Sequence, residues 1–173
     1  MKHFTLLSLI LMSFALVTAQ AETKSSPSAK GKNAAETGIR DWLDRFTKAF
    51  SEKNLEAIME FYADDVVAYD VVPPLQYVGK DAYRKDYEQF LALYEGNLHV
   101  EVRDLHIGTS GDLGFATGLE LISGVLKSGQ KSDIWIRFTS LYRKTNGHWL
   151  DFHDHISVPA DMESGKAMLD LKP

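Results

Sequence analysis

Cysteine is absent from the 173-residue sequence. Its absence excludes disulfide-stabilised scaffolds, zinc sites built on thiolates and catalysis by a cysteine nucleophile. Basic residues are also few, since 19 Lys and Arg stand against 24 Asp and Glu, for a formal charge of −5. Nucleic-acid binding requires a clustered basic surface, so we expect no nucleic-acid partner. The remaining composition, 45% hydrophobic and 25% charged, is typical of a globular domain.

The longest hydrophobic run lies near the start of the sequence, at residues 4–17. It follows the basic Lys2, precedes an Ala-x-Ala pattern that ends at Ala21, and is shorter than the about 20 residues of a membrane-spanning helix. These features predict a signal peptide over 1–21 and a periplasmic or secreted protein with no membrane contact after cleavage. Residues 22–36 are rich in Ser, Ala and Lys, which predicts a flexible linker.

The rest of the chain reads as one domain over 37–160, followed by a weakly helical tail over 161–173. Hydrophobic periodicity predicts helices over 37–51, 55–62 and 79–94. Asp64 and Asp65 are expected in a helix-to-strand turn. Alternating or β-branched segments and turn residues predict strands over 66–72, 98–107, 113–126, 132–143 and 148–158.

This element order predicts an α+β domain, with helices against one face of a mainly antiparallel sheet. Glycines within the predicted strand 113–126 suggest that the sheet bends strongly. A strongly bent sheet closed by helices forms a cone with an internal cavity, which is a natural site for a small molecule.

Three segments resemble one superfamily: FYADDVVAYD at 61–70, VGKDAYRKDY at 78–87 and GHWLDFHDHISVP at 147–159. They are similar to the NTF2-like superfamily, and within it to its SnoaL-like and ketosteroid-isomerase-like branch of small secreted bacterial proteins, including the DUF4440 type. The resemblance implies the NTF2-like cone, in which three helices from the N-terminal half and a bent sheet enclose a cavity. It specifies function weakly, because this fold carries many activities.

The resemblance also implies roles for individual residues. Asp70 matches the aspartate base, which moves a proton next to a carbonyl. The tyrosine of the oxyanion hole falls on Phe46, and its protonated aspartate falls at Thr139 or a residue beside it. Phe46 cannot donate a hydrogen bond, so we do not expect steroid isomerase activity, whereas a milder proton transfer without any cofactor stays open.

Alternation along the strand 132–143 places Trp135, Arg137 and Thr139 on one face, and the resemblance implies that this face lines the cavity. A buried arginine needs a partner, which would be Asp70, Asp151 or a ligand carboxylate. The alternative is that Arg137 is solvated or lies in an interface.

His153 and His155 share a face of the last predicted strand, together with Asp151. They are candidates for acid–base catalysis with Asp70, for hydrogen-bonded wall or interface residues, or for metal ligands. No third metal ligand lies at a telling spacing. Three tyrosines are expected in the core or at the rim, where they can also offer hydroxyls to a ligand: Tyr69, Tyr83 and Tyr87.

Two main functions follow. The first is an exported protein that binds a small, largely apolar ligand in the cone, with isomerase- or cyclase-like acid–base chemistry. The alternative is a non-catalytic binding or dimerisation module that pairs as a homodimer through its sheet, where an apolar strand face needs a cover: Ile134, Ile136, Phe138 and Tyr142. A weaker alternative is a histidine metal site.

Overall fold

The computed structural model describes residues 29–173, so the predicted signal peptide and the linker residues 22–28 lie outside the described part. In chain order the elements are α1 (Ala29–Ser51), α2 (Leu55–Glu60), β1 (Tyr62–Tyr69), β2 (Tyr77–Val78), α3 (Lys80–Ala92), β3 (Tyr94–Ser110), β4 (Leu113–Leu126), β5 (Lys131–Thr145) and β6 (His148–Ser157). None of these described helices has the length and hydrophobicity needed to span a membrane.

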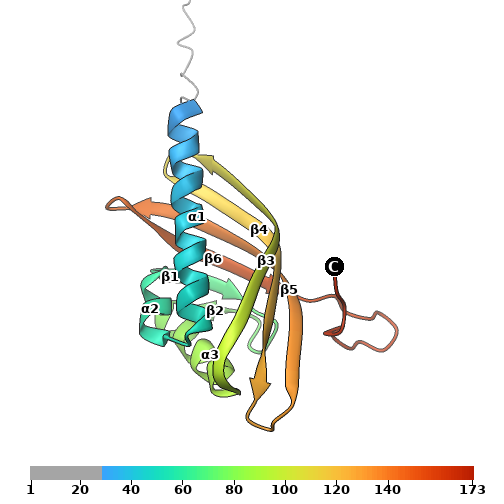
Figure 1. Cartoon of the computed structure of the whole chain (residues 1–173). Helices are drawn as coiled ribbons and strands as arrows, with labels where there is room; N and C mark the ends of the chain where they lie inside the picture. The colour runs from blue at the N-terminus through green and yellow to red at the C-terminus, as the bar shows by residue number, and fades with distance from the viewer. Residues whose placement is uncertain (1–28) are drawn as a thin grey trace, which may run out of the picture.

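The strands form a single six-stranded sheet in the order β2-β1-β6-β5-β4-β3. Only the pair β1–β6 is parallel, and the other pairs are antiparallel. The long strands β3, β4 and β5 curve, α1 crosses one face of the sheet, and α2 and α3 lie towards one end of it (Figure 1). The α+β cone predicted from the sequence is confirmed.

Several element boundaries differ from the prediction. Helix α1 begins at Ala29, inside the predicted linker, because Ala, Lys and Glu favour the helix even without a hydrophobic face. Strand β1 begins at Tyr62, so Asp64 and Asp65 lie within a strand rather than in a turn. The tail beyond β6 forms an isolated bridge between Ala160 and Ala167 instead of a helix.

The two exposed aspartates of β1 are tolerated in the strand because each pairs with a cation. Asp64 lies 2.9 Å from Lys80, the first residue of α3. Asp65 makes a two-contact ion pair with Arg143 of β5. The prediction of a turn failed here because the propensity of Asp for turns is weaker than the strand pairing of its neighbours.

The core begins on one face of α1. Trp42 and Phe46 stack with ring centroids 5.0 Å apart, and Phe46 stacks on Phe50 at 5.9 Å. Both Trp42 and Phe46 also meet the ring of Tyr62, the first residue of β1. These aromatic side chains fill the space between helix and sheet.

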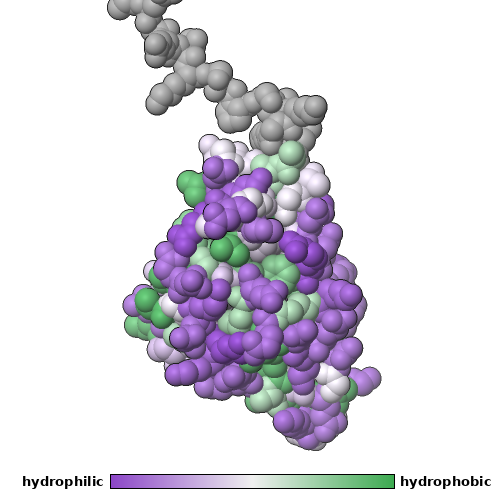
Figure 2. Space-filling model, turned by 90° about the vertical axis from the view of Figure 1, so that its left-hand side faces the viewer, coloured by the Kyte–Doolittle hydropathy of each residue, from purple (hydrophilic) through white to green (hydrophobic). Residues whose placement is uncertain are grey.

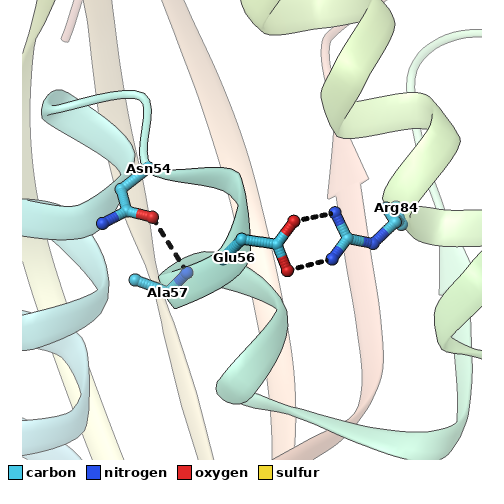
Figure 3. Close-up of polar contacts among 4 residues, drawn as sticks. All are labelled: Asn54, Glu56, Ala57 and Arg84. Carbon is cyan, nitrogen blue, oxygen red and sulfur yellow. Dashed lines mark hydrogen bonds and ion pairs between the residues drawn. The ribbon is translucent and has the colours of Figure 1, made fainter.

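Figure 3 shows one polar contact that caps α2 and one that joins α2 to α3. Asn54 caps α2, because its Oδ1 accepts a hydrogen bond of 3.1 Å from the backbone N–H of Ala57. Glu56 of α2 forms a bidentate ion pair with Arg84 of α3. Since Arg84 is the neighbour of Tyr83, this pair helps to fix the helix that carries much of the candidate site.

Neighbouring groups pack closely around Gly118 in β4. A Cβ built there would lie 2.8 Å from the Phe138 ring and 3.0 Å from the backbone oxygen of Arg103. Only glycine lets the Phe138 ring lie over this strand.

The surface drawn in Figure 2 is mostly hydrophilic, and its hydrophobic residues form small separate groups.

Candidate functional site

A cavity of about 620 Å³ lies between the helices and the inner face of the sheet. Its walls come from α1, α3 and strands β4, β5 and β6, and they are mostly apolar. The side chains that form these apolar walls include Trp42, Leu43, Phe46, Phe50, Phe90, Ile122, Ile134, Ile136, Phe138, Ile156 and Val158. A pocket of this size and composition suits a small organic molecule.

Asp154 of β6 is the most heavily hydrogen-bonded carboxyl in this cavity. Its Oδ1 accepts from the Ser140 hydroxyl at 2.8 Å, and its Oδ2 accepts from Tyr83 at 3.1 Å and from Tyr62 at 3.4 Å. The Tyr87 hydroxyl extends this network, at 2.6 Å from that of Tyr62. Burial raises the pKa of Asp154 to about 6, against the opposing effect of the hydroxyls of Ser140 and Tyr83.

Sheet register brings these groups together. Ser140 of β5 and Ala68 of β1 are the strand partners of Asp154 on its two sides. A register shift near Phe152 then interrupts the alternation of β6. As a result both Asp151 and Asp154 point to the interior, although they are three positions apart, and both are buried.

Asp70 directly follows β1 and also lines the cavity. Its Oδ2 lies 3.4 Å from the Tyr83 hydroxyl, so one tyrosine stands between Asp70 and Asp154. Burial raises the pKa of Asp70, and the hydrogen bond that its Oδ1 accepts from the backbone N–H of Val71 opposes this rise. Asp70 and Asp154 can therefore exchange a proton through the Tyr83 hydroxyl.

Asp86 of α3 extends the acidic group. Its Oδ1 accepts a hydrogen bond of 2.9 Å from Tyr77, which lies on β2. Burial and then the charge of Asp70 raise the pKa of Asp86 to about 6. Like charges at short range disfavour simultaneous ionisation, so Asp70 and Asp86 lose their protons in two separate steps.

Glu120 of β4 is the fourth carboxyl that lines the cavity. Burial and then the charge of Asp154 raise its pKa to about 8. Within the described part of the chain no hydrogen bond reaches its side chain. Asp151 lies deeper, and neither its carboxyl oxygens nor the Tyr142 hydroxyl has a hydrogen-bond partner among the described residues.

Basic side chains are missing from this site. Among residues 34–173, the cavity lining contains no Lys, Arg or His, although it contains four carboxyl groups. An anionic molecule would therefore meet like charges there and no cationic side chain to pair with.

Four of the predicted site residues do lie together. Phe46, Asp70, Tyr83 and Tyr87 all line the cavity. The resemblance matched the protonated aspartate to Thr139 or a residue beside it. Thr139 is absent from the cavity lining, whereas its neighbour Ser140 points inward to Asp154.

The predicted orientation of β5 is wrong. The face that lines the cavity carries Ile134, Ile136, Phe138 and Ser140, whereas Trp135, Arg137 and Thr139 lie on the opposite, outer face. Arg137 is exposed, and Trp135 packs beneath Arg103 of β3, with the guanidinium 5.1 Å from the ring. Because β5 carries apolar residues on both of its faces, the sequence does not indicate which face lines the cavity.

His153 and His155 also lie on the outer face, outside the cavity lining. They share that face with Tyr69, whose ring is 4.9 Å from His153 and 5.7 Å from His155. They do not meet Asp70 across the cavity, as the acid–base hypothesis required. Among the described residues no group of three or more His, Asp and Glu side chains is arranged to hold a metal ion.

Sequence reasoning missed Tyr62, Glu120, Ser140 and Asp154. A signal existed for Glu120, the one charged residue within the long apolar strand LGFATGLELISGVL. A second signal was the face that Asp154 shares with Ile156 and Val158, because a carboxyl among apolar residues of one strand face is unusual unless it is functional.

Comparisons with known proteins agree with this architecture. Residues 39–161 match the SnoaL-like domain family. An NTF2-like protein of unknown function from Pseudomonas putida KT2440 is 35% identical, with a TM-score of 0.74 over 82% of this chain and 98% of that one. No curated protein matches the chain.

Two more distant structures share the fold. A ketosteroid isomerase-like protein from Erwinia carotovora atroseptica is 22% identical, with a TM-score of 0.63 over 72% of this chain and 96% of that one. An NTF2-like superfamily protein from Salmonella enterica is 15% identical, with a TM-score of 0.67 over 79% of this chain and 99% of that one.

Proposed function

The chain belongs to the SnoaL-like family of NTF2-like proteins, and we propose that it binds a small, largely apolar molecule in its cavity and moves a proton on it. The observation that carries the proposal is the joining of Asp70 and Asp154 by one tyrosine hydroxyl at the wall of an apolar cavity. An apolar wall binds the ligand body, and the carboxyl pair supplies the chemistry.

The acid–base chemistry follows from the raised pKa values. A general acid or base works best when its pKa lies near the working pH, and the pKa of Asp154 is about 6. We assign the base to Asp70, at the exposed end of the pair. Its carboxylate takes a proton from a carbon next to a carbonyl, Tyr83 relays protons between the two aspartates, and the proton returns to the ligand without any oxidation or reduction.

Ligand binding is tested with N-phenyl-1-naphthylamine, a neutral fluorescent probe. We expect the probe to bind wild-type protein, and Ile134→Phe to weaken its binding because the larger ring narrows the cavity. Thr139→Val, on the outer face of the same strand, is the control. Equal binding by wild type and Ile134→Phe would place the probe outside the cavity and contradict the proposal.

Proton transfer is tested with 2-tetralone in D₂O, by following deuterium incorporation next to the carbonyl with NMR. We expect wild-type protein to accelerate the exchange, and Asp70→Asn and Asp154→Asn each to lose at least about tenfold, which is a low value for a general base. Asp133→Asn, on the exposed outer face, serves as the control. Exchange rates that are equal in all four proteins rule out the assigned carboxyls.

A second candidate function, homodimerisation, has its own observation. The outer face of the sheet carries half-buried apolar residues that no described element covers: Phe115, Leu119, Leu121, Trp135 and Leu141. We propose that a second copy of the chain covers them. Sedimentation should then show a dimer for wild type and a monomer for Leu119→Arg, whereas a monomeric wild type contradicts it.

Export is a further part of the proposed function, carried by the predicted signal peptide over 1–21. The mature protein recovered from periplasm or medium should begin at Glu22, as read by mass spectrometry. A product that retains residues 1–21 would contradict this assignment.

A further inference from the structure

We propose that the cavity takes an organic cation, namely an apolar molecule that carries a protonated amine, with Glu120 and Asp154 as the groups that hold the ammonium. This inference rests on the proposed function, because it requires that the cavity binds a small molecule. It adds the charge and the chemical class of that molecule, which the fold does not specify.

The charge balance of the lining is the first argument. Four carboxyl groups face one cavity, and no Lys, Arg or His among residues 34–173 faces it with them. Carboxyls placed together in an apolar space repel one another, and burial further disfavours their charge. A bound cation offsets both the repulsion and the cost of burying the carboxylate charge. An anion adds to the repulsion, and a neutral molecule offsets neither.

The second argument is the unpartnered carboxyl of Glu120. It projects from the inner face of β4, where its strand partners are Val102 of β3 and Ile136 of β5. No side chain or backbone group in the described part of the chain donates to it. Glu120 is half-buried and lines the cavity, so a ligand that brings N–H donors gains a charge-assisted hydrogen bond there.

The third argument is the aromatic wall. Trp42, Phe46 and Phe50 line the cavity from α1, and Tyr62 and Tyr87 face them from β1 and α3. Aromatic faces attract cations, and most strongly where water is excluded. Aromatic rings beside carboxylates therefore suit both the charged head and the apolar body of a hydrophobic amine.

Binding of a cation should depend on pH, because it competes with protons on the same carboxyls. No basic side chain among residues 34–173 lines the cavity, so none of them opposes the effect. The other titratable groups that line the cavity are Asp70, Asp86, Asp154, Tyr62, Tyr83, Tyr87 and Tyr94. Asp151 and Tyr142 are buried but do not line it. An alkylamine stays protonated up to a pH of about 10, so only the protein titrates near neutrality.

The test compares three matched molecules as competitors of N-phenyl-1-naphthylamine in the full-length mature protein. They are 4-phenylbutylamine, a cation, 4-phenylbutan-1-ol, its neutral counterpart, and 4-phenylbutyrate, an anion. At about pH 8 we expect the amine to bind at least about tenfold more tightly than the alcohol, and the butyrate to bind most weakly. This preference should shrink several-fold at about pH 6, as the carboxyls gain protons.

The variant Glu120→Gln keeps the shape of the side chain and removes its charge. We expect it to lower the affinity for the amine by about tenfold and to leave the affinity for the alcohol unchanged, which also confirms an intact cavity. Asp133→Asn, on the outer face, controls for net charge. Equal binding of amine and alcohol, or an unchanged preference in Glu120→Gln, overturns the inference while the proposed function stands; failure of all three molecules to displace the probe overturns both.

Discussion

Tyr83 on α3 donates a hydrogen bond to Asp154 on β6 across 3.1 Å, and the same hydroxyl lies 3.4 Å from Asp70. A tyrosine has one proton to donate, so it can serve only one of these carboxylates at a time. The aspartate that does not receive the hydrogen bond from Tyr83 is the one more easily protonated. This arrangement couples the two carboxyls, and it leads to the first prediction.

Replacing Tyr83 with Phe should raise the pKa of Asp154 above about 6, because the hydrogen bond from Tyr83 lowers it in the wild type. A carboxyl-detected NMR titration measures the change directly. Tyr94→Phe is the matched control, since the Tyr94 hydroxyl contacts Ser132 at 3.2 Å and reaches no carboxyl. A pKa of Asp154 that stays the same in Tyr83→Phe would show that the two groups are not coupled.

Stability should fall as the pH rises from about 5 to about 8. Glu120 holds its proton in the folded state up to a pH of about 8, whereas in the unfolded chain it loses the proton near 4.5. In this window the folded state binds more protons than the unfolded state, so the free energy of unfolding decreases with pH. Urea unfolding at several pH values measures it.

Glu120→Gln should make that decrease shallower, because the variant lacks a carboxyl whose pKa is raised to about 8 in the folded state. Exposed carboxylates such as Asp65 do not contribute in this window, since their ion pairs lower the pKa further below it. The same slope in wild type and variant would contradict the raised pKa of Glu120.

Phe46 is expected to be a strong contributor to stability. It is 8% exposed and stacks between Trp42 and Phe50, so Phe46→Ala should lower the free energy of unfolding by about 3–5 kcal/mol. Leu75→Ala is the control, because Leu75 is 96% exposed and should change stability by less than about 0.5 kcal/mol. Equal effects of the two substitutions in chemical denaturation would show that Phe46 is not part of the core.

His153 and His155 should be dispensable for the cavity. They lie on the outer face beside Tyr69, so the double substitution to Ala should leave probe binding and deuterium exchange within about twofold of wild type. Asp154→Asn, on the same strand, should lose the exchange. A loss of deuterium exchange in the histidine double variant would show that His153 and His155 take part in the proton transfer.

Local patterns were sufficient for most of the elements. The strand 113–126 was predicted with its observed bounds, and the helical periodicity of Trp42, Phe46 and Phe50 identified the buried face of α1. Composition and turn residues encode such features within a short window. Asp70 was found because the segment around it resembles a known family.

The inside of the sheet could not be predicted in the same way. Strand β5 carries apolar residues on both faces, so its alternation is compatible with Trp135 or with Ile136 in the cavity. In β6 the bulge near Phe152 breaks the period of two, which separates Asp151 from His153. Register shifts depend on pairing with distant strands, and a single strand does not encode them.

The sequence by itself therefore determined the α+β class, the order of the helices and of every strand except the two-residue β2, and the apolar face of the helices, because these depend on neighbours within a few residues. The tertiary structure decided which carboxyls share the cavity. Asp70, Asp86, Glu120 and Asp154 come from four different places in the chain and meet only through sheet pairing and the docking of α3. Their raised pKa values are a property of that shared apolar space, since burial is the largest cause for each.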